Sequence, residues 1–398
     1  MKVLMITPYL PFPLTSGGNI RTYNLLKNLS KKHDITLFSF IRRDEERRYV
    51  AELKPFCKKI RVFKRTSGPW HPRNLLLAAF TQYPLLVAIY LYQHAKKAIL
   101  DELASDHYDL IHAETFYVMP NIPKTSVPIL LVEQVIEYLV YQTYVERSRS
   151  PLAKLLYFDV AKIKYWEDYY WRRADRLATM SEDDREFIAK ATGRPDIKVV
   201  ANGVDPQYFA QTKKTVHSQP TVLFVGHFKW LPNKEAITFL VEKIWPRIKK
   251  SVSNARLWIV GRDPIQKIKD FGNQPDITVS DNIEDIRDAF GGADVLLAPI
   301  LNGKGTKYKV LEAMATGTPV VATPLGVEGI DANHNREVMV GHNPKELAQE
   351  TVTLLKNQTK SRKMAAAARH LVEKAYSWTA ISADLDQIYQ ELGKKKYG

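Results

Sequence analysis

The chain has 398 residues, more than one hydrophobic core usually serves, so two domains are expected. With 45% hydrophobic and 25% charged residues, its composition is that of a folded globular protein and excludes a disordered one. A lone cysteine, Cys57, excludes an internal disulfide, and the absence of a Cys/His cluster at ligand spacing argues against a structural zinc site. The apolar run at residues 3–7 is too short for a secretory signal, so we expect a cytoplasmic protein.

The formal net charge of +15 suggests nucleic acid, anionic membranes or phosphorylated ligands as partners. The basic excess is spread over both halves of the chain, and no helix-turn-helix, zinc-finger or RNP-like pattern accompanies it. We therefore expect no nucleic-acid partner.

In the first half, short apolar strands alternate with amphipathic helices, which is the pattern of a parallel sheet covered by helices on both faces. The first strand, residues 2–7, leads into a Pro-rich loop that ends in Gly17-Gly18, and a helix follows. This strand-loop-helix unit, with the alternating strands and helices that follow it, predicts a doubly wound α/β domain. The further predicted strands are residues 35–40, 59–63, 110–113, 129–133, 176–179 and 198–200.

The most apolar stretch, residues 75–92, is interrupted by Gln82 and Pro84, and the proline would break a membrane-spanning helix near its middle. We predict two helices that pack beside the first sheet. The alternative is an aromatic, apolar surface that makes a peripheral contact with an anionic membrane or a lipid-linked acceptor. Residues 166–173 also interleave aromatic and charged side chains, and core packing is favoured there over membrane contact.

After a polar linker at residues 211–220, the same alternation restarts and predicts a second parallel sheet. The last predicted helix, residues 379–393, has no strand after it and is free to pack on either domain. Predicted strands of this half are residues 221–225, 256–260, 295–299, 319–323 and 337–340, with helices at about 233–249, 284–290 and 309–316.

Ligands bind parallel sheets at the carboxyl ends of the strands, where Gly-rich turns and helix N-termini approach anions. The segment 302–309 combines two glycines, a threonine and three lysines between a strand and a helix, which indicates phosphate binding. A solvated loop with ordinary surface lysines is the alternative. The segment is not a P-loop, and no G-x-G-x-x-G with a suitably placed acidic residue supports nicotinamide binding. The candidate phosphate-binding residues are Gly303, Lys304, Gly305, Thr306, Lys307 and Lys309.

Glu312 follows Lys309 by three residues, so the two side chains should share one face of a helix. A carboxylate there can accept hydrogen bonds from a ribose diol. The alternative is a Lys309–Glu312 surface ion pair.

The stretch 309–323, KVLEAMATGTPVVAT, resembles the donor-site motif of retaining GT-B glycosyltransferases of the group 1 or family-four-like type. This family includes sucrose synthases and many bacterial mannosyl- and glucosyltransferases. The resemblance implies two Rossmann-like doubly wound domains that face each other across a cleft. It implies an acceptor domain at residues 1–205, joined by a returning C-terminal helix at about 379–398, and a donor domain at residues 206–378. Residues 8–18, 108–114, 201–205, 224–226, 259–261 and 376–378 support it.

The resemblance implies a nucleoside-diphosphate sugar as donor substrate, with no cofactor and no required metal. Glu312 would hold the ribose, and Lys307 and Lys309 would face the diphosphate. Gly17 and Gly18 would approach the same phosphates from the first domain, and Lys229 and Lys234 are further donor-site candidates. The implied reaction is retaining hexosyl transfer to a hydroxyl of a glycan or lipid-linked acceptor in cell-surface polysaccharide synthesis, at the inner face of the plasma membrane.

Two positions depart from the family pattern. The family's first donor-site glutamate would stand eight residues before Glu312, where this chain has Lys304. Gln134 replaces a frequent histidine, which keeps hydrogen bonding but not proton transfer. Gln134 and Lys309 are the candidate catalytic residues. Acceptor contacts are expected from His112, Glu133 and Glu137, although His112 is equally well interpreted as a satisfied strand-end histidine.

Two other kinds of function share these features. One is a GT-B-fold sugar-nucleotide epimerase or phosphorylase, and the other is a non-catalytic protein that binds nucleotide sugars.

Overall fold

The structure, a computed structural model, describes residues 1–148, 154, 156–215, 218–281, 283–303 and 305–395. The chain divides into two compact units. The first unit contains Met1–Val200 with Ser382–Gly398, and the second contains Ala201–Ile381.

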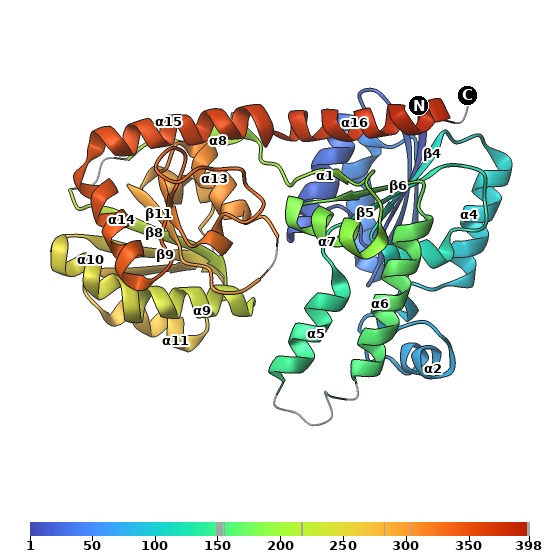
Figure 1. Ribbon diagram of the computed structural model, residues 1–398, viewed down its shortest axis with the longest axis horizontal. Coiled ribbons are helices and arrows are strands. Elements are labelled where there is room, and N and C mark those ends of the chain that lie inside the picture. The colour runs from blue at the N-terminus through green and yellow to red at the C-terminus, as the bar shows by residue number, and fades with distance from the viewer. Residues whose placement is uncertain (149–153, 155, 216–217, 282, 304, 396–398) are drawn as a thin grey trace. The chain divides into compact units, whose positions relative to one another are not determined.

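A seven-stranded sheet forms the centre of the first unit, in the order β3-β2-β1-β4-β5-β6-β7, and all of its neighbouring strands are parallel. Helices lie on both sides of this sheet (Figure 1). Its central strand, β1, is apolar along nearly its whole length because both faces of a parallel sheet are buried. The strands are β1 (Lys2–Thr7), β2 (Asp34–Ile41), β3 (Lys59–Lys64), β4 (Leu110–Glu114), β5 (Ile129–Glu133), β6 (Arg176–Thr179) and β7 (Lys198–Val199).

The helices of the first unit begin where capping residues follow strands. Ser16 accepts a hydrogen bond from the Asn19 N–H at the start of α1, and Ser181 accepts one from the Asp184 N–H at the start of α7. The apolar stretch at residues 75–92 forms two helices, α2 and α3, as predicted. The helices are α1 (Gly17–Leu29), η1 (Asp44–Phe56), α2 (Pro72–Phe80), α3 (Leu85–Ala88), α4 (Gln93–Ser105), η2 (Phe116–Asn121), α5 (Glu137–Arg147), α6 (Leu156–Arg173) and α7 (Glu182–Thr192).

The second unit has a six-stranded parallel sheet in the order β10-β9-β8-β11-β12-β13. Two parallel sheets with helical connections confirm the predicted α/β class with two Rossmann-like domains. Strand β10 was not predicted. The strands are β8 (Thr221–His227), β9 (Arg256–Arg262), β10 (Ile277–Asp281), β11 (Val295–Ala298), β12 (Val320–Ala322) and β13 (Met339–Val340). The helices are α8 (Pro206–Ala210), α9 (Leu231–Phe239), η4 (Leu240–Ile244), α10 (Trp245–Ser251), α11 (Gln266–Asp270), η5 (Phe271–Asn273), α12 (Ile286–Gly291), α13 (Tyr308–Thr316), η6 (Pro324–Gly326), α14 (Pro344–Lys356) and α15 (Gln358–Ala375).

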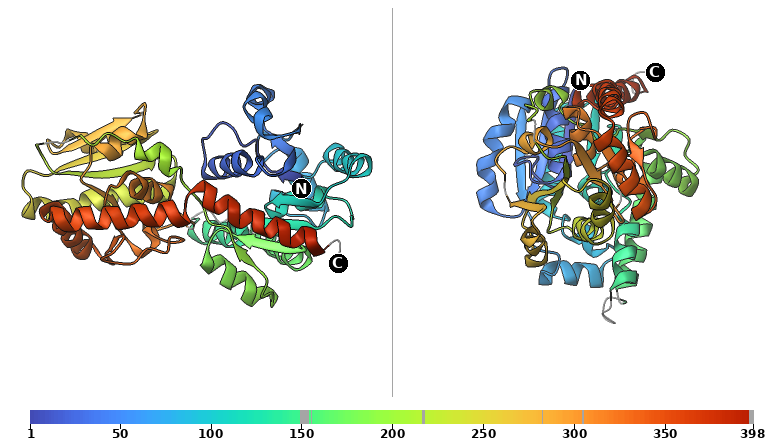
Figure 2. Two further views of the ribbon diagram at one scale, coloured as in Figure 1. Left: turned by 90° about the horizontal axis from the view of Figure 1, so that it is seen from above. Right: turned by 90° about the vertical axis from the view of Figure 1, so that its left-hand side faces the viewer.

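The last helix, α16 (Trp378–Lys395), belongs to the first unit from Ser382 onward. Its buried residues there include Leu385, Tyr389 and Leu392. Figure 2 shows the end of this helix, in red, beside the N-terminus of the chain. A Cβ atom on Gly393 would lie only 2.7 Å from Met1 Cε, so the C-terminal helix packs directly against the start of β1.

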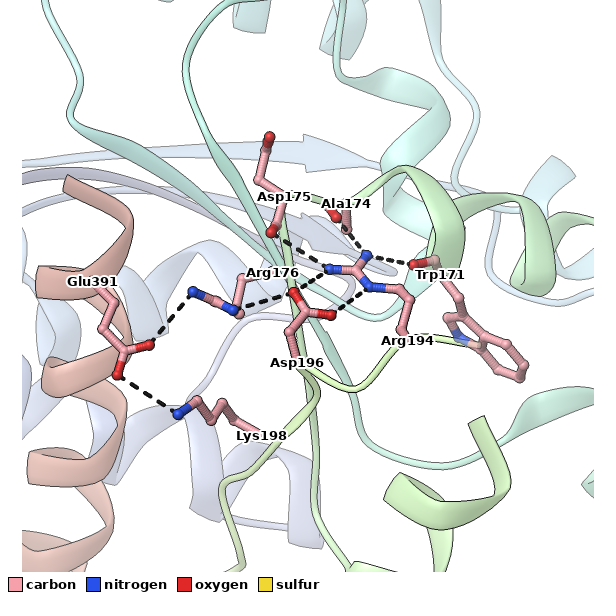
Figure 3. Close-up of polar contacts among 8 residues, drawn as sticks. All are labelled: Trp171, Ala174, Asp175, Arg176, Arg194, Asp196, Lys198 and Glu391. Atoms are coloured by element: carbon pink, nitrogen blue, oxygen red, sulfur yellow. Dashed lines mark hydrogen bonds and ion pairs between the residues drawn. The ribbon is translucent and has the colours of Figure 1, made fainter. Parts of the chain in front are cut away.

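Polar contacts reinforce the packing of α16 on the first unit. Glu391 lies 3.5 Å from Arg176 of β6 and 3.6 Å from Lys198 of β7 (Figure 3). Near the start of β2, His33 Nε2 lies 2.9 Å from Asp386 Oδ1. The C-terminal segment is therefore an integral part of the first unit.

Candidate functional site

In the second unit, the first turn of α13 carries the side chain with the most defined surroundings. Lys309 donates a hydrogen bond of 2.8 Å to Asn233 Oδ1, and the Asn233 amide donates one of 2.9 Å to the His227 carbonyl. The Lys309 ammonium also lies 4.8 Å from the centre of the Phe224 ring. Since β8 ends at His227 and α13 follows β11, two neighbouring strand ends fix the position of this ammonium.

Lys309 and Glu312 lie in a poorly hydrated part of this site, although both residues keep some exposed surface. Burial lowers the pKa of Lys309 to about 7, and the nearby Glu312 carboxylate opposes that effect. Burial raises the pKa of Glu312 to about 7, with Lys309 acting in the opposite direction. A bound diphosphate would favour the charged form of Lys309 because an opposite charge stabilises an ammonium.

The Glu312 carboxylate accepts no hydrogen bond from the described part of the chain, and the predicted alternative of a Lys309–Glu312 ion pair is not formed there either. Its oxygens are therefore available to a ligand. A carboxylate at this position could accept hydrogen bonds from a ribose diol.

The loop before α13 is held by its own contacts. Lys307 donates a hydrogen bond of 3.0 Å to the Gly303 carbonyl and another to the Gly305 carbonyl. Glu328 Oε2 accepts a 3.0 Å hydrogen bond from the Gly305 N–H and lies 3.5 Å from the Lys307 ammonium. Lys307 thus cross-links the loop, and contact with a diphosphate would require it to exchange these partners.

The glycines of this loop serve its backbone conformation. Gly303 and Gly305 have φ angles of 99° and 85°, which residues with a Cβ rarely adopt. Thr306 is buried, so its side chain is not displayed to a ligand. Lys304, a further predicted donor-site residue, lies outside the described residues.

Lys229 and Lys234 belong to the segment that also carries Asn233, the hydrogen-bond partner of Lys309. Lys229 Nζ lies 3.3 Å from Asp263 Oδ2, which also lies 2.7 Å from His227 Nε2. Lys234 lines an open pocket of about 410 Å³ together with Glu235, Lys243 and Lys267. Neither lysine contacts a described residue of the loop before α13 through its ammonium group.

The first unit brings Gly18 together with Gln134, and with a residue that the sequence analysis missed. A Cβ atom on Gly18 would lie 2.2 Å from Tyr9 Oη and 3.0 Å from Gln134 Oε1, so any other residue there would have to displace the Tyr9 hydroxyl. Gly17 is the first residue of α1, directly after the cap Ser16. Tyr9 lies just after β1, and this strand-end position would have identified it in the sequence as a candidate site residue.

The Gln134 amide is fully engaged within the unit. Its Nε2 lies 2.6 Å from Tyr9 Oη and donates a hydrogen bond of 2.8 Å to Glu114 Oε2, while Oε1 accepts one of 2.9 Å from Tyr9 Oη. Tyr9, Glu114 and Gln134 stand at the carboxyl ends of the adjacent strands β1, β4 and β5. A ligand can therefore reach the Gln134 amide only if it binds beside the Tyr9 hydroxyl or displaces that hydroxyl.

Glu114 was also missed, and it lies completely buried behind Gln134. Desolvation raises the pKa of the Glu114 carboxyl, but His112, Arg21 and Gln134 outweigh it and hold that pKa below its usual value. Glu114 is thus a buried anion that orients the Gln134 amide.

Two of the predicted acceptor contacts point into the protein. His112 is fully buried, with Nε2 3.2 Å from Glu114 Oε1 and Nδ1 2.5 Å from Tyr389 Oη. Glu133 is 2% exposed and accepts a 3.0 Å hydrogen bond from Trp171 Nε1. Burial, with Glu167 nearby, raises the pKa of Glu133 well above its usual value. Both side chains are out of reach of an acceptor, which corrects the expectation and supports the strand-end interpretation of His112.

Glu137, at the first turn of α5, is partly exposed. Its N–H donates a 2.7 Å hydrogen bond to Glu167 Oε1, so the helix start is capped by another carboxylate. Burial raises the pKa of Glu137 itself to about 7. It therefore stays a candidate for acceptor contact.

Two consecutive α/β units, each built on a parallel sheet, define a two-domain protein of the GT-B class. Residues 15–208 match the family model of "Glycosyltransferase Family 4", and residues 219–357 match that of "Glycosyl transferases group 1". The chain is a GT-B glycosyltransferase of the group 1 and family 4 type.

Curated relatives extend over most of the chain. The "44.6 kDa protein in cps region" of Klebsiella pneumoniae is 22% identical over 388 residues, which cover 94% of this chain and 96% of that protein. A phosphatidyl-myo-inositol mannosyltransferase of Mycobacterium leprae is 24% identical over 304 residues, or 73% of this chain and 75% of the relative.

Solved structures share the fold over nearly the whole length. A sucrose-phosphate synthase from Thermosynechococcus elongatus has a TM-score of 0.71 at 18% identity and covers 98% of this chain and 99% of its own. Anabaena HepE, solved in complex with UDP, has a TM-score of 0.66 at 15% identity, with coverages of 98% and 100%.

Proposed function

We propose that the protein transfers a hexose, with retention of anomeric configuration, from a nucleoside-diphosphate sugar to a hydroxyl of a glycan or lipid-linked acceptor. The observation that carries this proposal is the placement of Lys309 and of the uncommitted carboxylate of Glu312 three residues apart on α13. Lys309 would neutralise the leaving diphosphate, with the N-terminus of α13 adding partial positive charge. Glu312 would hold the ribose.

The proposal of retention is supported by the side chain of Gln134. An amide is neither a general base for an inverting displacement nor a nucleophile for a double displacement. If Gln134 lies beside the transferred sugar, the departing diphosphate oxygen is the group placed to take the acceptor's proton on the same face. Because lysine and helix N–H groups can meet the phosphate charge, we also propose that no metal is required.

The comparisons support the choice of substrates. Anabaena HepE was solved with UDP, and the mycobacterial relatives carry the name phosphatidyl-myo-inositol mannosyltransferase. A relative from a cps region supports a role in cell-surface polysaccharide synthesis. We propose that the protein acts at the inner face of the plasma membrane.

A panel of nucleotide sugars, tested with and without glycan and lipid-linked acceptors, distinguishes the candidate activities. We expect nucleoside diphosphate to be released only when an acceptor is present. We also expect this release to persist in EDTA. An altered nucleotide sugar without transfer would indicate an epimerase, and binding without turnover would indicate a non-catalytic protein.

A further inference from the structure

Helix α2 presents an apolar face to solvent. Leu76 is 58% exposed and Phe80 is 83% exposed, and their spacing of four residues places them on one side of the helix. Leu75 and Ala79 form a second exposed pair at the same spacing. Trp70, just before the helix, is 61% exposed. We call these five residues the α2 face.

The α2 face is held outward by polar contacts on the inner side of the helix. Asn74 is fully buried and donates hydrogen bonds of 2.8 Å to Thr66 Oγ1 and 3.1 Å to the Gly68 carbonyl. The Arg73 guanidinium donates a 3.1 Å hydrogen bond to the Ala88 carbonyl and lies 4.0 Å from the centre of the Tyr92 ring. The exposure of the apolar side is thus built into the structure at the start of the helix.

The other end of α2 is anchored to α6. The Lys162 ammonium donates hydrogen bonds of 2.6 Å to the Ala78 carbonyl and 2.9 Å to the Thr81 carbonyl. Phe158 lies one turn before Lys162 on the same side of α6 and is 78% exposed. The apolar surface therefore continues from α2 onto the first turn of α6, two elements that lie near each other in Figure 1.

The stretch of sequence that contains α2 is basic, although Lys58, Lys59 and Lys64 within it pair with the carboxylates of Asp34, Glu102 and Asp44. Residues 53–100, which include α2, contain nine lysines and arginines and no aspartate or glutamate. A basic segment that carries exposed Trp, Leu and Phe has the composition of a helix that lies in the interface of an anionic bilayer. None of the described helices is long and apolar enough to cross a membrane, so this helix would lie on the surface.

A protein partner or a second copy of the chain is less consistent with the size of this surface. Stable protein interfaces use about 20–30 residues on each side. The α2 face and Phe158 provide six, and the helix has nine residues. Insertion into lipid needs no matching surface, since each apolar side chain leaves water independently.

We propose that the α2 face, with Phe158, docks the protein onto an anionic lipid surface. This surface deepens the proposed action at a membrane by naming the residues that make the contact. The α2 face contains no residue of the donor site, so lipid binding can be measured without donor or acceptor. A failure of the lipid-binding proposal would therefore leave the proposed transfer activity untouched.

The test uses the full chain and vesicles of phosphatidylcholine, with or without phosphatidylglycerol, in a sedimentation assay at low and high salt. We expect the wild type to bind vesicles that contain phosphatidylglycerol, more weakly at high salt. The double variant Leu76→Ser/Phe80→Ser should lose binding at least about tenfold. Because both side chains are exposed, an unchanged melting temperature is expected and should be confirmed.

The matched control is Ile265→Ser, which removes a 43% exposed apolar side chain of the second unit and should bind like the wild type. Equal binding of wild type and double variant, or no vesicle binding by the wild type, would overturn the proposal. Analytical ultracentrifugation provides a second readout. A dimer of the wild type that the double variant abolishes would assign the face to self-association and would also overturn it.

Discussion

At the donor site, Glu312 is the residue whose substitution tests the proposed ribose contact most directly. We expect Glu312→Gln to weaken donor binding by about 1–3 kcal/mol, because a charge-assisted hydrogen bond becomes a neutral one. Isothermal titration calorimetry with nucleoside diphosphates measures this change. Glu284→Gln, at an exposed position of the same unit, is the control and should leave the affinity unchanged. Equal affinities of Glu312→Gln and the wild type would remove Glu312 from the site.

Lys309 is expected to reduce stability in a pH-dependent way. Its pKa is about 7 in the folded protein, against 10.5 for an unperturbed lysine, so between these values the unfolded chain binds the proton more strongly. The cost of burying the ammonium is full below pH 7 and disappears as the pH rises through 10.5. The stability of Lys309→Met relative to the wild type should therefore be highest near pH 6 and decline toward pH 10.

Denaturant unfolding of the second unit at several pH values measures this difference. Loss of the hydrogen bond to Asn233 shifts the variant's stability by a similar amount at every pH, so the slope with pH is the diagnostic quantity. A difference that stays constant from pH 6 to pH 10 would show that Lys309 keeps an ordinary pKa.

Glu114 should matter for the stability of the first unit. In Glu114→Ala, the Gln134 amide loses a buried acceptor and His112 loses its neighbour, which should cost about 1–3 kcal/mol or more of unfolding free energy. Tyr389→Phe removes only one hydroxyl from His112 and should cost about 0.5–1.5 kcal/mol. Thermal unfolding of both variants gives the comparison. A Glu114→Ala protein as stable as the wild type would contradict the assignment of Glu114 as a buried anion that orients Gln134.

At the scale of elements, Arg194 joins three segments of the first unit. Its guanidinium donates hydrogen bonds of 2.7 Å and 2.6 Å to the Trp171 and Ala174 carbonyls, at the end of α6 (Figure 3). It also binds both carboxylate oxygens of Asp196, at 2.9 Å and 2.8 Å. This bidentate pairing orients Asp196 toward Arg176, 3.1 Å away.

We expect Arg194→Ala to lower the unfolding free energy by about 1–3 kcal/mol, because it leaves carbonyls at a helix end without their donor. Glu391→Ala removes only two longer ion pairs, at 3.5 Å and 3.6 Å, and should cost no more than about 1 kcal/mol. The melting temperatures of the two variants show which substitution destabilises the protein more. A larger loss for Glu391→Ala would place the main stabilisation in the docking of α16.

At the scale of the whole molecule, the proposed mechanism predicts the stereochemistry of the product. With an α-linked nucleotide sugar as donor, the product should also be α-linked, because Gln134 offers neither base nor nucleophile. NMR of the first-formed product reports the anomeric configuration. A β-linked product would exclude retention and would direct attention to Glu137, a partly exposed carboxyl group just after β5.

The class of fold and the donor motif could be predicted from the sequence because both depend on local pattern. Buried parallel strands are continuous apolar runs, and the segment from Lys309 to Glu312 presents its functional side chains on one short helix. Strand β10 escaped prediction because it lies at the edge of its sheet and is largely uncovered, so its sequence, ITVSD, carries little apolar signal.

Tertiary structure alone decided which polar side chains gather at the strand ends and which are directed into the core. Tyr9, Glu114 and Gln134 come from three strands far apart in the sequence, and they meet because β1, β4 and β5 are neighbours in the sheet. His112 and Glu133 are directed inward by the alternation of side chains along β4 and β5 and by the packing of α16 and α6 over them. The apolar composition of α2 was visible in the sequence, but its outward orientation depends on contacts with Thr66, Ala88 and Lys162, which no local pattern encodes.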